Sequence, residues 1–232
     1  MNPLIRIMES SKFHYLLASL ALMIVSYPFI EGRGLAAHLF LFINLAIFFS
    51  SLYMLDHSPR LRLFAYINGG MMLLFGILSS IMPVVPQVME IIFAVSTLSF
   101  FVFLVMAIIA DFLHTQEVTT DTISGAACVY LLIGIIWSLA YALLEHIYPG
   151  SFHSSMPKKV ISLTNTSSFS YFSFVTLTTV GFGDITPVSK GAKLLVIMEA
   201  ILGQLYIAIF LARIIGSYQR VEKSDPPPEE KT

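Results

Sequence analysis

The sequence predicts an all-α membrane protein with six transmembrane helices and one short re-entrant helix. Three observations support this prediction. Of the 232 residues, 56% are hydrophobic and only 12% are charged, whereas soluble domains usually carry about 25% charged residues. Six apolar stretches reach the length of about 20 residues that a bilayer crossing requires. A further apolar stretch, between the last two, is too short to cross.

The predicted crossings are separated by helix-breaking residues. Pro28 and Gly34 stand in the first break, Pro59 in the second, and Pro83 and Pro86 in the third. Proline lacks the backbone N–H of a helix and glycine favours turns, so both mark boundaries. The crossings are predicted at about 13–30, 35–55, 61–82, 88–113, 123–148 and 191–216.

Basic residues predict the orientation. Arg6 and Lys12 precede the first crossing, but residues 27–31 (YPFIE) offer no small-residue cleavage site. The first segment is therefore predicted to be a retained helix and not a secretory signal.

With an even number of crossings, both termini share one side of the membrane. That side would carry eight Lys and Arg residues and the other side five, which predicts cytoplasmic termini. Short loops and a compact tail are compatible with a bacterial inner membrane.

The short apolar stretch, residues 167–179 (SSFSYFSFVTLTT), is followed directly by VGFGD. A helix of about 12 residues enters the bilayer without crossing it. Non-helical backbone at membrane depth is tolerated only where protein or a water-filled cavity surrounds it. The stretch that contains the two glycines is therefore predicted to line a hydrated path.

The composition of this path suits a dehydrated cation, which needs oxygen ligands in place of water. Successive backbone carbonyls point the same way only if the backbone alternates between right- and left-handed conformations. Glycine accepts the left-handed conformation, which accounts for Gly181 and Gly183. Val180 is expected to pack against the short helix, and the Thr179 hydroxyl to add a further ligand. One chain supplies too few oxygens, so several copies are expected around an axis.

The TTVGFGD stretch resembles the selectivity filter of potassium channels, in which four such loops replace the hydration shell of the ion. The resemblance implies a homotetramer in which K⁺ is the permeant ion. It implies that K⁺ is bound by the carbonyls of Thr179, Val180, Gly181 and Phe182 and by the Thr179 hydroxyl. Gly183 completes the filter.

The resemblance extends beyond the filter. Residues from about 123 to 216 are similar to the outer helix, pore helix, filter and inner helix of the family's pore module. The resemblance divides the chain into three parts. Residues 1–120 form a four-helix membrane domain, 121–218 the pore domain, and 219–232 a disordered cytoplasmic tail. Asp121 is expected to cap the outer helix.

Two positions depart from the family pattern. Phe182 stands where tyrosine is commoner, and its ring lacks a hydroxyl that would anchor the filter to the pore helix. Some members carry an acid nine residues before the aspartate that follows the filter, and the two acids pair. Here that position is Val175, so Asp184 must find another partner or face the outer solution. Thr178, Val175 and Asp184 flank the filter and are its expected supports.

The inner helix carries a glycine at the spacing where the family often has a hinge. Gly203 is therefore a candidate gating hinge, and close packing against a neighbouring helix is an equally good explanation. Gln204, Ile207, Leu211 and Ile215 recur at helical spacing. If Gly203 sets the register, these four side chains line an apolar cavity that could close by dewetting.

Glu199 is the unusual charge of the inner helix, because an acid inside a membrane helix is costly and generally functional. One hypothesis places it on the ion path, where it would attract cations. The other places it behind the filter, hydrogen-bonded to Ser173 or Thr176. We favour the second hypothesis, because the register above directs Gln204 to the axis.

The first four helices lack the array that senses voltage in six-helix channels. Such an array repeats arginine every third position. The fourth crossing, 88–113, contains no Lys or Arg, and its charges are Glu90 and Asp111 at the two ends. Elsewhere in this part, Asn44 and Asn68 are expected to hydrogen-bond between helices, and Gly69, Gly70 and Gly76 to permit close packing.

The sequence thus predicts a passive K⁺-selective channel that is not an enzyme. A weakly selective cation channel on the same scaffold, and a structural or sensory membrane protein whose loop does not conduct, remain alternatives. An intramembrane enzyme is disfavoured, because no serine–lysine, paired-aspartate or histidine–glutamate arrangement lies at membrane depth. The net charge of −1 lacks the basic excess of nucleic-acid-binding proteins. The expected partners are the bilayer, K⁺ and further copies of the chain, with no cofactor.

The absence of a basic array gives a first testable prediction. Conductance should depend only weakly on membrane potential, because the fourth crossing carries no charge that could move through the field. Recordings from reconstituted protein over a range of potentials measure this dependence. A steep conductance–voltage curve with several gating charges would contradict it.

Overall fold

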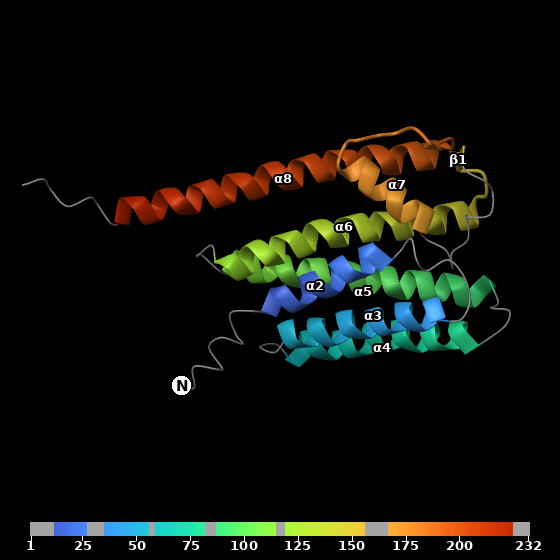
Figure 1. The fold of residues 1–232 in the computed structure, drawn as a ribbon, viewed down its shortest axis with the longest axis horizontal. Coiled ribbons are helices and arrows are strands. Elements are labelled where there is room, and N and C mark those ends of the chain that lie inside the picture. Colours follow the sequence, from blue (N-terminus) through green and yellow to red (C-terminus); the bar gives the residue numbers. More distant parts are fainter. Residues whose placement is uncertain are drawn as a thin grey trace, which may run out of the picture.

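The computed structural model describes residues 12–26, 35–55, 59–81, 87–114, 119–155 and 167–224, and it is helical apart from two short strands (Figure 1). The elements in chain order are α2 (Lys12–Ser26), α3 (Leu35–Met54), α4 (Pro59–Ile81), α5 (Gln87–His114), α6 (Thr120–Ile147), β1 (Phe152–Ser154), α7 (Ser167–Leu177), β2 (Ile185–Pro187) and α8 (Lys190–Ser224).

Four helices of the described chain are long and apolar enough to cross a membrane: α4, α5, α6 and α8. The apolar helix α2 has 15 residues, or about 22 Å at the usual rise, which is less than the hydrocarbon thickness of about 30 Å. The corresponding short apolar segment of α3 is Leu41–Met54. The last four residues of the first predicted crossing, 27–30, lie outside the described residues. A complete crossing by the first two segments therefore stays a prediction.

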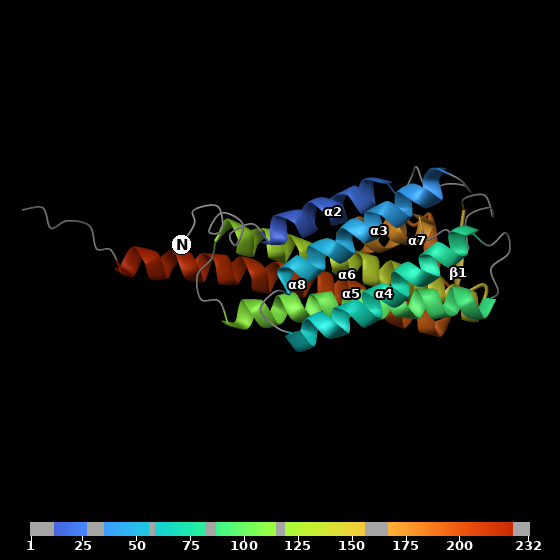
Figure 2. The ribbon, with the colours of Figure 1, turned by 90° about the horizontal axis from the view of Figure 1, so that it is seen from below.

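The helices form layers around α6. In Figure 1 α7 and α8 lie on one side of α6, and α2 to α5 lie on the other. Figure 2 shows that α3 and α4 lie obliquely across α5 and α6. The larger hydrophobic cluster joins α2, α3, α4, α5 and α6. Its fully buried members include Phe13, Leu16, Ile43, Ile47, Phe100, Leu104 and Leu132.

The packing predictions for α4 are confirmed at Asn68 and Gly69 but not at Gly70, where an added Cβ would meet no atom within 4 Å. Ser99 of α5 donates a hydrogen bond of 3.1 Å to the side-chain oxygen of Asn68. At Gly69 an added Cβ would lie 2.4 Å from the ring of Phe48 and 3.1 Å from that of Phe100. Only glycine lets α4 approach its neighbours this closely.

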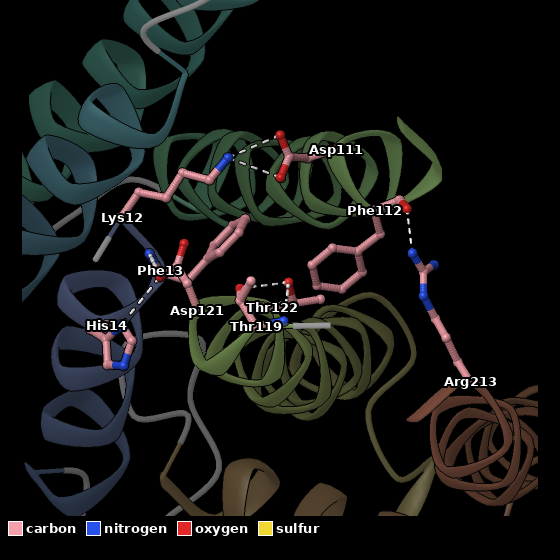
Figure 3. Close-up of polar contacts among 9 residues, drawn as sticks. All are labelled: Lys12, Phe13, His14, Asp111, Phe112, Thr119, Asp121, Thr122 and Arg213. Carbon is pink, nitrogen blue, oxygen red and sulfur yellow. Dashed lines mark hydrogen bonds and ion pairs between the residues drawn. The ribbon is translucent and has the colours of Figure 1, made fainter. Parts of the chain in front are cut away.

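The start of α6 differs from the prediction. Its N-cap is Thr119, whose side chain accepts from the backbone of Thr122 in a capping box. Asp121 instead turns toward α2, where its Oδ1 accepts from the Phe13 N–H at 3.0 Å and lies 3.2 Å from Nδ1 of His14 (Figure 3). The first N–H groups of a helix lack partners within it, so this buried carboxylate completes the first turn of α2.

The same end of the molecule joins α2 to α5 and α5 to α8. Lys12 forms an ion pair with Asp111, with 2.9 Å between Nζ and Oδ2. Arg213 of α8 donates to the backbone oxygen of Phe112 at 2.5 Å, and its guanidinium lies over the Phe112 ring (Figure 3). Carbonyls in the last turn of a helix are unpaired within it and carry partial negative charge. Arg213 therefore caps the end of α5.

The inner helix is longer than predicted. α8 has 35 residues and ends at Ser224, whereas the sequence predicted a crossing that ends at 216 and a disordered tail from 219. The remaining residues of the predicted tail lie outside the described chain. The helix therefore continues at least two turns past the predicted crossing.

The carboxylate at the start of α6 gives a second prediction. Asp121→Ala should lower the free energy of unfolding by about 1–3 kcal/mol, because it leaves a buried N–H without an acceptor. Asp121→Asn keeps an oxygen for the Phe13 N–H and should lose less. Unfolding by sodium dodecyl sulfate, followed by circular dichroism, measures both. Equal stability of the alanine variant and the unchanged protein would contradict the prediction.

Candidate functional site

The short helix α7 is held in place by an aromatic cluster. Phe169 and Phe172 are buried, and their rings pack on Tyr141 of α6 and on Phe152 of β1, with centroids 5.2 Å apart for the pairs Tyr141–Phe172 and Phe152–Phe169. On the other side, Gly134 of α6 makes room for α7. These contacts fix the position and the direction of α7, whose C-terminal end leads into the filter segment.

At Gly134, the Phe174 side chain of α7 packs against the backbone of α6. An added Cβ at Gly134 would lie 2.6 Å from the ring of Phe174, closer than any normal carbon contact. The backbone oxygen of Phe174 also accepts from the Thr178 hydroxyl at 2.6 Å and from the Thr178 N–H at 3.0 Å. Thr178 therefore closes the last turn of α7, which is a concrete form of the supporting role expected for it.

The filter segment is bound to the end of α7 through the backbone. The N–H groups of Val180 and Gly181 both donate to the Val175 oxygen, at 3.0 and 3.3 Å. The Thr179 N–H donates to the Thr176 oxygen at 2.9 Å. Terminal carbonyls of a helix need such partners. Val175 therefore supports the filter through its carbonyl, although its side chain cannot replace an acid.

The backbone of the filter alternates in handedness. Positive φ angles occur at Thr179 (62°), Gly181 (58°) and Gly183 (78°), and not at Val180 or Phe182 between them. This is the alternation that the two glycines predict. Thr179 was missed as a left-handed position, and among the described non-glycine residues it is the one with a positive φ. Such a conformation costs about 1–2 kcal/mol, and the hydrogen bond of its N–H offsets part of that cost.

The filter side chains are open in the single chain. Val180 is 54% exposed, so the predicted packing of this side chain against α7 is not provided by its own chain. Phe182 is 69% exposed, and its ring lies parallel to that of Tyr171 on α7, with centroids 6.4 Å apart and 2° between the planes. Phe182 thus contacts the pore helix by stacking, without the missing hydroxyl.

Asp184 finds its partner in Tyr171, one turn before Val175 on α7. The side chains of Tyr171 and Asp184 are hydrogen-bonded. Asp184 Oδ1 also accepts from the Ile185 N–H at 3.0 Å. Tyr171 therefore contacts both the ring of Phe182 in the filter and Asp184, which follows the filter. The sequence did not reveal this role.

A small sheet fixes the segment after the filter. β1 pairs with β2 in antiparallel register, with His153 opposite Thr186. The backbone oxygen of Asp184 accepts from the Ser155 N–H at 3.0 Å. Glu145, at the end of α6, shapes the turn that leads into β1, because its carboxylate accepts from the N–H groups of Gly150 and Phe152. The sequence analysis did not predict this sheet, whose strands have only three residues each.

Glu199 lies behind the filter and is fully buried. Its Oε1 is 2.5 Å from Oγ of Ser173 on α7, and its Oε2 is hydrogen-bonded to the hydroxyl of Tyr141 on α6. The structure therefore matches the second hypothesis for Glu199, with Ser173 as the partner. Tyr141, also fully buried, was missed because nothing near it in the sequence marks it.

Gly203 has a packing role in the structure. An added Cβ would lie 2.7 Å from Leu177 Cδ1 and 2.9 Å from the Leu177 oxygen. α8 passes here over the last residue of α7, so that even alanine would displace the end of the pore helix. This contact supports the packing explanation for the glycine, and α8 is continuous through this position.

The far face of α8 is uncovered. Only 11% of residues 190–216 are buried, against 50% of α6. The four predicted cavity residues Gln204, Ile207, Leu211 and Ile215 are all exposed in the single chain. These residues therefore enclose no cavity within one chain, and their cavity-lining role stays a prediction.

Comparison with known proteins places the site in context. Residues 129–220 match the family model described as "Ion channel". This part of the chain is similar to ion channels. The match takes in most of α6, all of α7, the filter segment and most of α8. Together with the apolar helices, it supports a multi-pass membrane protein and an ion channel. The curated proteins and the solved structures gave no match.

The double contact of Tyr171 gives a third prediction. Tyr171→Phe keeps the ring that stacks on Phe182 but removes the hydroxyl that bonds to Asp184. The segment after the filter should become less firmly held, so currents should decline faster during sustained opening. Tyr66→Phe, the same change at an exposed position of α4, is the control and should leave the time course unchanged. Identical decay in both variants would contradict the role of the hydroxyl.

Proposed function

We propose that the chain is one subunit of a homotetrameric, K⁺-selective channel in which residues 179–183 form the filter. The alternating backbone at these residues is the observation that supports this proposal best. Alternation turns successive carbonyls in the same direction, and rings of such carbonyls replace the hydration shell of K⁺. The carbonyls of Thr179 to Phe182 and the Thr179 hydroxyl are the proposed ligands. K⁺ is the transported ion and not a cofactor.

Assembly follows from what one chain leaves uncovered. Val180, Phe182 and most of α8 are exposed in the single subunit. The chain contains one filter segment, and four such loops surround the ion in potassium channels. Neighbouring subunits would cover Val180 and one face of α8, and the bilayer would cover the rest.

The gating stimulus is proposed to act on the membrane domain without an arginine array. The contact of Arg213 with the end of α5 joins this domain to the inner helix at the end opposite the filter. Movement of α5 would thereby reach α8 beside Leu211 and Ile215, two of the proposed cavity residues. We further propose that both termini face the cytoplasm and that the protein resides in a bacterial inner membrane.

Flux from liposomes tests the function. Purified protein should carry K⁺ down its gradient, and bi-ionic reversal potentials should favour K⁺ strongly over Na⁺. Gly183→Ala should abolish selective flux, because an L-residue resists φ of +78° although no atom lies within 4 Å of the added carbon. Gly70→Ala, on helix α4 and equally free of neighbours, is the matched control and should conduct normally.

The outcomes separate the alternatives. Equal permeability to K⁺ and Na⁺ would indicate a weakly selective cation channel. Absence of flux, together with a tetramer whose stability does not respond to K⁺, would indicate a protein whose filter-like loop does not conduct. Normal selective flux through Gly183→Ala would remove the filter from the proposal.

A further inference from the structure

The three helices of the pore domain meet at one buried polar cluster. Tyr141 of α6, Ser173 of α7 and Glu199 of α8 have no exposed surface. The hydroxyl of Tyr141 bonds to Oε2 of Glu199, Oγ of Ser173 lies 2.5 Å from Oε1, and the same Oγ lies 2.7 Å from the backbone oxygen of Gly134. A chain of hydrogen bonds therefore runs from α6 through α8 and α7 back to α6.

Counting the hydrogens in this cluster shows where a proton must be. Two oxygen atoms that lie 2.5–2.8 Å apart require a hydrogen between them. Ser173 has one hydroxyl hydrogen and two such contacts. The Gly134 carbonyl can only accept, so the hydrogen of Ser173 belongs to that contact. The contact between Ser173 and Oε1 then needs a hydrogen from Glu199, which an ionised carboxylate does not have.

The surroundings of Glu199 also disfavour a negative charge. In the part of the chain that the structure describes, ion pairs join Lys12 to Asp111 and His14 to Asp121, and neither pair includes Glu199. The titratable groups that face Glu199 are Tyr141 and, through its electrostatic effect, Tyr130, both on α6. α7 contributes only the hydroxyl of Ser173. A buried carboxylate without a cation is far costlier than a buried neutral acid.

We propose that Glu199 is held as the neutral carboxylic acid, and that the hydrogen bond donated by this acid positions the pore helix. The acid donates from Oε1 to Ser173 and accepts at Oε2 from Tyr141, so every hydroxyl of the cluster has one acceptor. Ser173 stands two residues before Val175, whose carbonyl holds Val180 and Gly181 of the filter. Glu199 is thus a positioning residue, and its effect on conduction rests on the proposed function.

Loss of this proton has a defined consequence. The ionised Glu199 would face the Ser173 oxygen without a hydrogen, unless Ser173 released the Gly134 carbonyl. Either change weakens the attachment of α7 to α6 or to α8. The filter is attached to the end of α7. The carbonyls proposed to bind K⁺ would therefore lose their arrangement at alkaline pH.

Infrared spectroscopy tests the protonation without relying on conduction. Protein in lipid nanodiscs at neutral pH should show a protonated carboxyl C=O band that is absent in Glu199→Gln. Tyr141→Phe should shift this band to higher frequency, because its C=O oxygen loses a hydrogen bond. The Tyr141→Phe spectrum assigns the band even if the glutamine variant does not fold. A carboxylate band lost in Glu199→Gln, or a protonated band unmoved in Tyr141→Phe, would overturn the proposal.

K⁺ flux across a pH series tests the positioning role. Glu199→Gln supplies an amide donor to Ser173 and a carbonyl acceptor to Tyr141, so flux at neutral pH should stay within about twofold of the unchanged protein. Glu199→Leu supplies neither and should lose at least about tenfold, since buried partners are left unpaired. Flux of the unchanged protein should fall at alkaline pH, and that of the glutamine variant should not.

The two proposals fail in different ways. No K⁺ flux from the unchanged protein at any pH would refute the channel, and the infrared bands would still decide the protonation. Identical alkaline declines in the unchanged protein and in Glu199→Gln would refute the positioning role of the proton while leaving the channel intact.

Discussion

The attachment of the filter to the end of one short helix is the constraint on which the rest of the site depends. The carbonyl of Val175 lies near the end of α7 and accepts hydrogen bonds from the N–H groups of Val180 and Gly181. Because these N–H groups point back to α7, the carbonyls of the same residues are free for other ligands. A displacement of α7 would therefore be transmitted directly to the filter.

The remaining contacts hold α7 still. Aromatic rings from α6 and β1 pack along its buried side, Gly134 lets it approach α6, and Gly203 lets α8 pass over its last residue. Glu199 and Ser173 add directional bonds, which apolar packing cannot supply. Beyond the filter, Tyr171 and the small sheet fix Asp184. The filter segment is thus restrained at both ends, while the side chains of Val180 and Phe182 stay exposed.

The membrane domain is joined to this assembly mainly along α6 and at the end opposite the filter. Asp121 completes the first turn of α2, and Arg213 caps the end of α5. Both are charged groups on pore helices that satisfy backbone groups of the membrane domain. Such contacts are directional, and the second of them joins the membrane domain to α8. Neither was foreseen, since each pairs residues that are about 100 positions apart.

The sequence by itself determined the long apolar helices, the short pore helix and the left-handed glycines of the filter. These features are local: hydropathy over about 20 residues sets a crossing, and the lack of a Cβ sets the conformations open to glycine. Tertiary structure alone decided that Tyr141 and Ser173 share Glu199, that Tyr171 replaces an acid beside Asp184, and that Thr119 caps α6 while Asp121 serves α2. Each of these depends on which helix faces lie together. A hydrogen-bonding side chain has no sequence period that names its partner, and only the packing of α6, α7 and α8 brings the partners within reach.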